Sequence, residues 1–200
     1  MALLLAILVA FILYPILCVL WIALSDETGN LTLIHFLNFF RRPLFREALW
    51  DTLASGILVV VFGGLMSLPL AYIIARYEFR GKILLQTAAT LPLVIPPFVG
   101  AVALQLILGR SGMVNLLLMR WFDTTFPFME GLAGVVLVQT LHFFPFILLN
   151  TVVSLANIDP SMEEMAQNMG CHGFRLFRRI TLPLMLPGFV AGSLLTFIRA

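Results

Sequence analysis

Long apolar runs separated by polar intervals dominate this chain of 200 residues. Runs of roughly twenty apolar residues match the length that an α-helix needs to cross the hydrocarbon core of a bilayer. A backbone in lipid must satisfy its own hydrogen bonds, so these runs are expected to be helices. The pattern predicts an all-α, polytopic transmembrane bundle with about five spans: Met1–Leu24, Thr52–Ala75, Ile83–Leu108, Gly131–Ala156 and Leu184–Ala200.

Two of these runs need a comment. The first, Met1–Leu24, lacks the basic start and the small-residue cleavage site of a secretory signal, so it is interpreted as a retained span. The third is broken early by Pro92, Pro96 and Pro97. These prolines are candidates for a gate, but kinks without gating are common in membrane helices, and that reading is favoured.

The polar intervals predict an orientation. Cations are dense in the very short interval Arg76–Lys82 and recur in the interval Asn157–Leu182. They are diluted over the longer intervals Ser25–Asp51, interpreted as a surface segment, and Gly109–Glu130, interpreted as a polar connection. The excess of cations in short cytoplasmic loops then places Arg76–Lys82, Asn157–Leu182 and Met1 in the cytoplasm.

Composition supports the membrane interpretation and excludes several other classes. The chain is 61% hydrophobic and 11% charged, far from the balance of a soluble domain. A net charge of +2 with scattered cations gives no nucleic-acid footprint. The chain has no phosphate-loop sequence of an ATPase and no Cys/His cluster for a metal. No catalytic constellation is recognisable.

The interval near Asn157–Leu182 has its own helical pattern. Asp159 is a good N-cap and Pro160 fits a first helical position, so a helix is expected from Pro160 to about Met169. One face of that helix carries residues at the spacing i, i+3, i+4 and i+7, namely Met162, Met165, Ala166 and Met169. Such a methionine-rich face can adapt to a partner.

The helix is expected to end at Gly170, a typical C′ residue, and a second short helix, Phe174–Ile180, is expected to follow before Pro183 starts the next span. The result would be a helix–glycine–helix hook at the membrane surface. On composition alone, a pair of interfacial amphipathic helices with arginines at the lipid headgroups fits this stretch about as well as a docking site.

The spacing of six residues distinguishes these two interpretations. They are Glu164, Ala166, Gly170, Ile180, Leu182 and Pro183. Their arrangement resembles the EAA motif of the inner-membrane permeases of binding-protein-dependent ABC importers, and Met165 stands where that family usually has a second alanine. At background frequencies of roughly 5–10% each, six specified residues would match by chance about once in a million windows or fewer. RYEFRGK at Arg76–Lys82 and LPLVIPP at Leu91–Pro97 are also similar to the family.

The resemblance implies a function for the whole chain. It implies a non-catalytic permease subunit in the bacterial inner membrane, with Glu164, Ala166, Gly170, Ile180, Leu182 and Pro183 coupling it to a cytoplasmic ATPase. ATP and Mg²⁺ would be used by that partner, so no cofactor is expected in this chain. The other implied partners are a periplasmic or lipid-anchored solute-binding protein, a second permease domain and membrane lipid. In style, the chain is most similar to permeases for ferric iron, 2-aminoethylphosphonate and polyamines.

The resemblance also suggests how the chain is divided. Residues 1–51 would be an N-terminal transmembrane helix with a periplasmic connection, and residues 52–200 a permease domain that lacks at least one further helix. The alternative is a secondary transporter or channel that needs no ATPase, with the hook as a membrane-surface anchor.

Polar residues inside the predicted spans are candidates for the solute pathway. Gln105, Gln139 and His142 could line it, although Gln105 and Gln139 equally suit hydrogen bonds between helices, and a neutral, hydrogen-bonded His142 is the favoured reading. Arg199 could attract an anionic solute, but snorkelling toward the membrane surface is favoured. These residues do not identify the solute.

Overall fold

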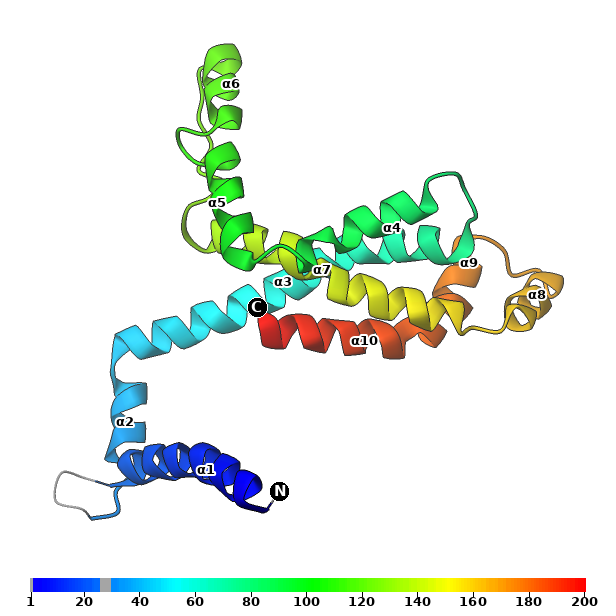
Figure 1. The fold of residues 1–200 in the computed structure, drawn as a ribbon. Helices are drawn as coiled ribbons and strands as arrows, with labels where there is room; N and C mark the ends of the chain where they lie inside the picture. The colour runs from blue at the N-terminus through cyan, green and yellow to red at the C-terminus, as the bar shows by residue number, and fades with distance from the viewer. Residues whose placement is uncertain (1, 26–29) are drawn as a thin grey trace. The chain divides into compact units, whose positions relative to one another are not determined.

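A computed structural model describes residues 2–25 and 30–200 of the chain. Met1 and residues 26–29, which belong to the predicted first span and the predicted surface segment, lie outside the described residues. Apart from one isolated bridge between Ser25 and Leu31, the described residues form helices and their connections, as the all-α prediction requires. The chain divides into the units Met1–Asp51 and Thr52–Ala200 (Figure 1).

The N-terminal unit contains α1 (Ala2–Leu24), α2 (Ile34–Arg41) and the start of α3 (Pro43–Arg76). The α2 helix is rich in aromatic residues, and Phe39 stacks on Phe45 at a centroid distance of 5.1 Å. Pro43 suits the first turn of α3, where no amide donor is needed. No glycine or further proline follows until Gly56, so the second span starts at Pro43 and not at Thr52 as predicted.

The larger unit holds the rest of the helices. They are the remainder of α3, α4 (Lys82–Thr90), the 3₁₀ turn η1 (Leu91–Leu93), α5 (Pro97–Leu108), α6 (Met113–Phe122), α7 (Gly131–Ala156), α8 (Pro160–Asn168), α9 (Phe174–Leu176), the π-helical turn η2 (Phe177–Thr181) and α10 (Leu182–Arg199). Five helical segments of the described chain are long and apolar enough to cross a membrane: Ile7–Leu24, Pro43–Arg76, Pro97–Phe122, Gly131–Ala156 and Phe174–Arg199.

The third predicted span, Ile83–Leu108, is wrong in its bounds. Pro96 and Pro97 lack amide donors, and the helix that starts at Lys82 ends before them, at Thr90. A new helix, α5, then begins at Pro97, and the membrane-length segment runs from Pro97 to Phe122. The predicted polar connection Gly109–Glu130 therefore contains a helix, α6.

Asn115 holds the turns on either side of α6 together. Its side chain is buried, with Nδ2 donating to Gly109 O and to Phe126 O at 2.9 Å, while the Phe126 amide donates to Oδ1 at 2.9 Å. Arg110 forms an ion pair with Glu130 across the same connection. This connection is ordered by polar contacts that the hydrophobic pattern does not encode.

The fifth span also differs from the prediction. The predicted separate helix Phe174–Ile180 and the predicted span Leu184–Ala200 form one helical run, Phe174–Arg199. Pro183 lacks an amide donor, and the turn that precedes it, η2, is π-helical. The helix therefore passes Pro183 instead of restarting at it.

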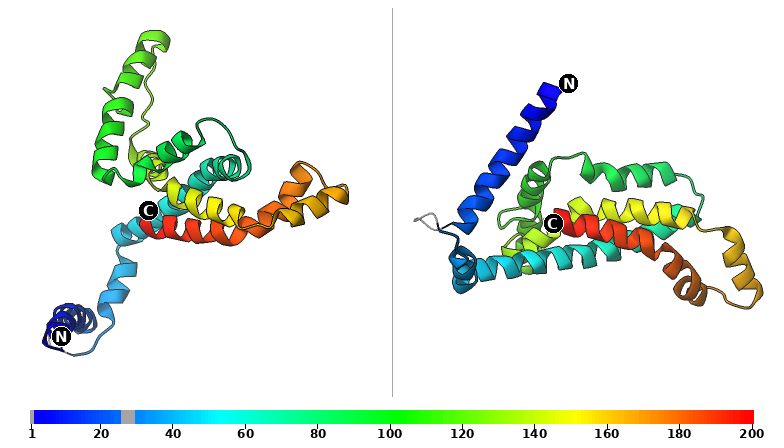
Figure 2. Two further views of the ribbon diagram at one scale, coloured as in Figure 1. Left: turned by 45° about the vertical axis from the view of Figure 1, so that its right-hand side comes forward. Right: turned by 90° about the horizontal axis from the view of Figure 1, so that it is seen from below.

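Glycines allow α7 and α10 to pack closely as antiparallel neighbours (Figure 2). A Cβ placed on Gly188 would lie 2.6 Å from the backbone carbonyl oxygen of Asn150 in α7. On the α3 side, Ser67 Oγ donates to Phe144 O of α7 at 2.9 Å. Small residues and buried hydroxyl groups are the usual means of holding helices together in lipid. The apolar core that these helices share with α4 and the start of the hook consists of Ala71, Ile74, Ala89, Phe144, Leu148, Leu155, Ile158 and Met185.

Candidate functional site

The hook, residues 157–181, leaves the end of α7 and returns into α10 (Figure 1). Its first helix, α8, starts as the sequence predicts. The Asp159 carboxylate accepts a hydrogen bond from the Ser161 amide at 2.9 Å, and Pro160 occupies the first turn. That backbone hydrogen bond holds the pKa of Asp159 below its ordinary value, because it favours the ionised carboxylate.

Gly170 ends α8 as predicted. Its φ is +82°, in the left-handed region that favours glycine. The Gly170 amide donates to Gln167 O at 2.9 Å and the Cys171 amide donates to Ala166 O at 3.0 Å, the two bonds of a Schellman turn. Gly173, with φ of +59°, reverses the chain again before α9.

The methionine-rich face of α8 divides into an outer and an inner part. Met165 and Met169 are 58% and 83% exposed, and Glu164 is exposed beside them. Ala166 is only 2% exposed. The small side chain of Ala166 therefore packs α8 against the rest of the larger unit, and its role in coupling to an ATPase stays a prediction.

The remaining motif residues lie at the base of the hook. Ile180 is half-buried in η2, Leu182 packs against the core shared by α3, α7 and α10, and Pro183 is exposed in the first turn of α10. The structure thus gathers the six motif residues in one exposed helix and its base. Glu164 lies in the outer part, while Ala166 and Leu182 lie in the inner part.

A polar cluster under the hook was not singled out from the sequence. Glu163 Oε1 accepts hydrogen bonds from Arg76 Nη2 at 2.7 Å and from Thr181 Oγ1 at 2.8 Å. The bond to Arg76 places Arg76–Lys82 and the hook at the same end of the bundle, as the cation pattern predicts. A signal was present, because ionisable residues at span ends are usually paired, but spacing alone could not match the partners.

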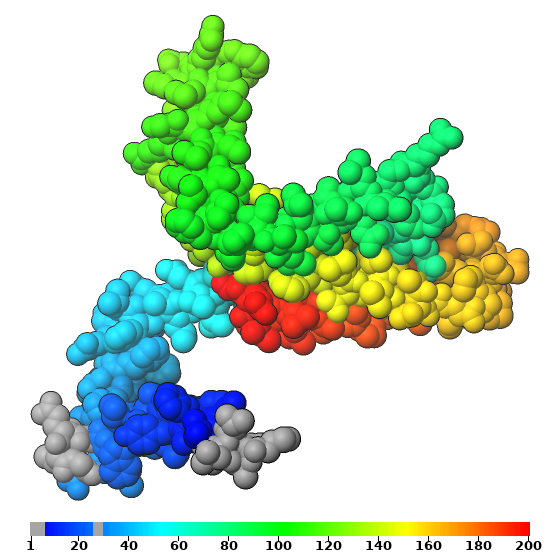
Figure 3. Space-filling view, viewed as in Figure 1, coloured from blue at the N-terminus to red at the C-terminus, as the bar shows by residue number. Residues whose placement is uncertain are grey.

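A groove of about 640 Å³ lies between α3 and the second half of the hook. It is lined by apolar and aromatic side chains together with Gln167, and Tyr72 of α3 meets Phe177 edge-to-face at 5.5 Å. In the space-filling view, the hook forms one end of the larger unit (Figure 3). Within the hook, three arginine side chains are exposed beside the residues that line this groove: Arg175, Arg178 and Arg179.

The predicted pathway residues do not form one site. His142 lines a cavity of about 270 Å³ together with Pro92 and Pro97. Gln139 Nε2 instead donates to Ala200 O at 2.7 Å, and Gln105 is exposed on α5. Arg199 lies over the ring of Phe146, with its guanidinium carbon 5.8 Å from the ring centroid.

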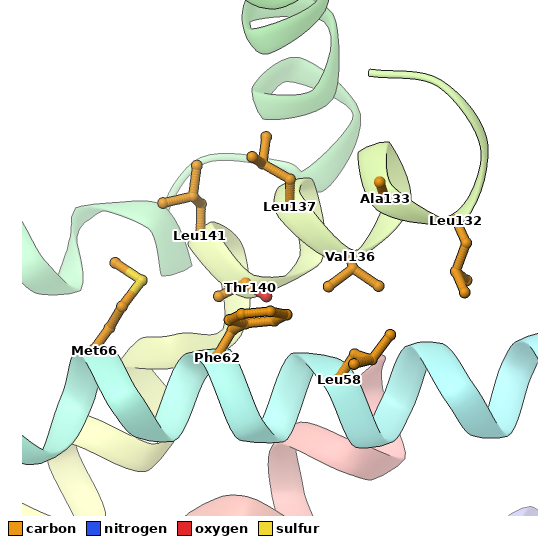
Figure 4. Close-up of a pocket in the computed structure, with 9 residues that line it drawn as sticks. All are labelled: Leu58, Phe62, Met66, Leu132, Ala133, Val136, Leu137, Thr140 and Leu141. Atoms are coloured by element: carbon orange, nitrogen blue, oxygen red, sulfur yellow. The ribbon is translucent and has the colours of Figure 1, made fainter. Parts of the chain in front are cut away.

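A second cavity, of about 620 Å³, lies between α3 and α7 (Figure 4). Leu58, Phe62 and Met66 of α3 face Val136 and other apolar residues of α7, and the hydroxyl of Thr140 is the polar side-chain group among the labelled residues. Such a lining cannot replace the hydration shell of an ion, so this cavity does not suit a charged solute.

Comparison with known proteins identifies the family. The family described as binding-protein-dependent transport system inner membrane component matches residues 67–200, which include the C-terminal part of α3, the hook and α10. The chain belongs to this family. Its described residues include five membrane-length helical segments, so this inner membrane component is a multi-pass membrane protein.

Named members of the family are similar over most of this chain. The molybdenum transport system permease protein ModB of Haemophilus influenzae is 40% identical over 71% of this chain and 63% of its own length. ModB of Escherichia coli is 35% identical over 76% of this chain and 67% of its own length. The probable sulfate transport system permease protein cysT of Nephroselmis olivacea is 27% identical over 89% of this chain and 62% of its own. The chain thus spans about two thirds of these relatives.

The fold matches that of a solved transporter. A bacterial ABC transporter involved in the import of the acidic polysaccharide alginate superposes with a TM-score of 0.77 at 23% identity, covering 96% of this chain and 68% of that one. The relatives also correct one expectation. Their names point to molybdenum and sulfate, and not to the ferric iron, 2-aminoethylphosphonate or polyamine permeases that the sequence style suggested.

Proposed function

We propose that this chain is the permease subunit of an ATP-driven importer, and that its hook is the surface on which a separate cytoplasmic ATPase docks. The observation that carries the proposal is the hook itself. A motif of six residues folds into an exposed helix, closed by Gly170, at one end of a membrane bundle. In a secondary transporter, the hook would serve only as a membrane-surface anchor.

The geometry suggests which residues meet the ATPase. Glu164 offers a carboxylate, and Met162, Met165 and Met169 offer flexible apolar contacts, since all four are exposed. Ala166 and Gly170 shape the helix and its turn and make no contact of their own with the partner. Ile180, Leu182 and Pro183 connect the hook to α10. Of the six motif residues, Glu164 would therefore contact the ATPase, and the other five would shape the hook or connect it to α10.

Transport would follow from a difference in affinity. Closure of two ATPase subunits on ATP and Mg²⁺ would move the hooks and favour an outward-facing path, and release of ADP and phosphate would restore the inward-facing one. A loaded solute-binding protein can promote this change only if it binds the outward state more tightly. The permease contributes no catalysis to the cycle. A second permease domain would complete the path.

The proposed solute is a tetrahedral oxyanion with two negative charges, and molybdate and sulfate are the two candidates. The support is the similarity to molybdenum and sulfate permeases. A dianion is costly to desolvate, so its path must offer cations or hydrogen-bond donors. Within the spans predicted from the sequence, Arg199 and His142 are the candidate cationic side chains for this.

Uptake by cells tests the proposal. The full permease would be expressed with its ATPase and binding protein in cells that lack their own molybdate and sulfate importers. Radioactive molybdate and sulfate would be offered, with ferric iron and spermidine as comparison solutes. ATP depletion should abolish oxyanion uptake, whereas collapse of the ion gradient at constant ATP should not.

A variant of the hook links uptake to docking. Glu164→Lys should abolish uptake and reduce recovery of the ATPase with the permease, while the amount of permease in the membrane is unchanged. Uptake that follows the ion gradient and ignores ATP depletion would identify a secondary transporter. Normal uptake by Glu164→Lys, with the ATPase still bound, would contradict the coupling role.

A further inference from the structure

One carboxylate oxygen joins three helical elements at the base of the hook. Glu163 Oε1 in α8 accepts from Arg76 Nη2 at the end of α3 and from Thr181 Oγ1 in η2. The Arg76 and Glu163 side chains are only 18% and 16% exposed, and Thr181 is buried. The cluster therefore lies inside the larger unit, and water does not separate its members.

The positions of these residues reinforce the contact. Arg76 is in the last turn of α3, where a cation interacts favourably with the negative end of the helix dipole. Glu163 is in the first turn of α8, where an anion is favoured. Hydrogen bonds between ionised groups are stronger than neutral ones, and removing one partner of a buried pair leaves the other charge without compensation.

Apart from this cluster, Ala166 is the buried residue of α8 itself. Around Gly170 and Gly173 the chain reverses at positive φ, so the connection from α8 to α9 runs through two turns. Ala166 contributes a buried methyl group, which is a small apolar contact. Without the cluster, α8 would be held to the bundle mainly by its two connections and this contact. A force on the outer face would then tilt α8 and leave the spans where they are.

Two adjacent carboxylates on α8 thus point to different surroundings. Glu164 is exposed on the outer part of the helix, whereas Glu163 is turned toward α3 and η2. We propose that Arg76, Glu163 and Thr181 form a latch that transmits movement of α8 to α3 and α10 together. They are positioning residues, and the inference rests on the proposed ATPase docking at the outer part of α8.

The first measurement tests the latch without transport. Spin labels would be placed on cysteines introduced at the exposed positions Tyr77 and Met169, after the native Cys18 and Cys171 are replaced by serine. The distance distribution between the labels would be recorded for the full permease in lipid. Glu163→Gln should broaden it, because the neutral amide holds the Arg76 guanidinium weakly. An unchanged distribution would overturn the latch, whatever the uptake assay gives.

A neighbouring ion pair supplies the matched control. Lys82 Nζ pairs with Glu78 Oε1 at 2.5 Å on the same side of the bundle, and Glu78 is 89% exposed there. Glu78→Gln removes the same charge without touching α8, so the distance distribution and uptake should both equal those of the unmodified protein.

The second measurement separates transmission from folding. In the complete assembly, Glu163→Gln should lower uptake per ATP hydrolysed by about tenfold or more, with normal membrane level and normal ATPase recovery. A merely structural pair would lower the amount of protein and leave this ratio unchanged. That result would overturn the latch.

Reversing the pair provides the rescue. Arg76→Glu combined with Glu163→Arg keeps opposite charges at the two sites, and the Thr181 hydroxyl can accept as well as donate. The double variant should recover a narrow distance distribution and part of the uptake that each single variant loses. No recovery in either measurement would overturn the latch. Absence of ATP-dependent uptake in the unmodified assembly would instead contradict the proposed function. The spin-label distance distributions would still test whether the latch holds α8 to α3.

Discussion

Gly192 of α10 meets the backbone of Ile147 in α7, and a Cβ placed on Gly192 would lie 2.7 Å from the Ile147 Cα. Gly188, one turn earlier, approaches Asn150 of α7 in the same way. Two glycines four residues apart on one helix thus set its distance from the next. In lipid, where apolar side chains gain little by leaving the solvent, such close packing is a main source of helix association.

Replacing Gly192 by alanine should therefore destabilise the protein. The new methyl group would meet backbone atoms, which cannot turn aside, and overpacking of this kind typically costs about 1–3 kcal/mol. The measurement is the midpoint of thermal unfolding in detergent, together with the amount of protein in the membrane. The control is Gly100→Ala on α5, where a Cβ would meet nothing within 4 Å.

Gly100→Ala should leave the midpoint unchanged or raise it slightly, since alanine is the better helix former. Equal midpoints for Gly192→Ala and the unmodified protein would mean that α7 and α10 separate without cost, contrary to the packing described above.

The turn after α8 predicts a different kind of defect. Gly170→Leu would place a side chain at a φ of +82°, where no other atom is within 4 Å of the new Cβ, so the cost is backbone strain and not collision. That strain is about 1–2 kcal/mol for most residues. We expect oxyanion uptake to fall sharply while the membrane level is maintained.

Gly170→Asn is the matched variant, because asparagine adopts left-handed backbone more readily than leucine. It should retain most of the uptake and most of the protection of α8 amides from hydrogen exchange. If asparagine impaired uptake as severely as leucine, the effect of Gly170 would arise from contact with the partner and not from its backbone conformation.

Much of the fold was predictable because a bilayer constrains it strongly. The bounds of α7 were predicted as the structure has them, since Glu130 and Asn157 flank a long, mainly apolar run that contains no Asp, Glu, Lys or Arg. The start of α8 at Pro160 and its end near Gly170 were also predicted, because capping and left-handed glycine are local effects.

The failures were of another kind. The hydrophobic pattern joined α4 to α5, because apolar residues continue through Pro96 and Pro97 although the backbone hydrogen bonds do not. It divided η2 from α10 at Pro183, where a π-turn keeps the helix continuous. The pairing of Arg76 with Glu163, 87 positions apart, depends on tertiary packing that no local pattern encodes.

Asn115 gives a prediction for the connection around α6. Asn115→Ala would leave the partly buried Phe126 amide and the buried Gly109 carbonyl without their side-chain partner, at a cost of about 1–3 kcal/mol for each buried group left unpaired. The connection should then open, and limited proteolysis near residues 109–130 should become faster while the hook is unaffected. Asn115→Asp keeps the acceptor but loses the donor, so it should be impaired too. Proteolysis at the original rate in Asn115→Ala would contradict this role.

Asp159 predicts how the hook responds to acid. Its pKa is lowered by the hydrogen bond from the Ser161 amide, so the folded hook binds this proton less readily than the unfolded chain. The stabilisation is therefore complete above the ordinary pKa and is lost as the pH falls through the lowered one, in the range below about pH 4. Hydrogen exchange of the α8 amides, corrected for the intrinsic pH dependence, should show increased opening there.

Asp159→Asn tests whether Asp159 carries this response. Asparagine is an equally good N-cap but does not titrate, so the variant should keep α8 protected at neutral pH and lose the part of the acid response that belongs to Asp159. Asp159→Ala should open α8 at every pH, because the Ser161 amide loses its acceptor. An acid response in Asp159→Asn equal to that of the unmodified protein would contradict this role of Asp159.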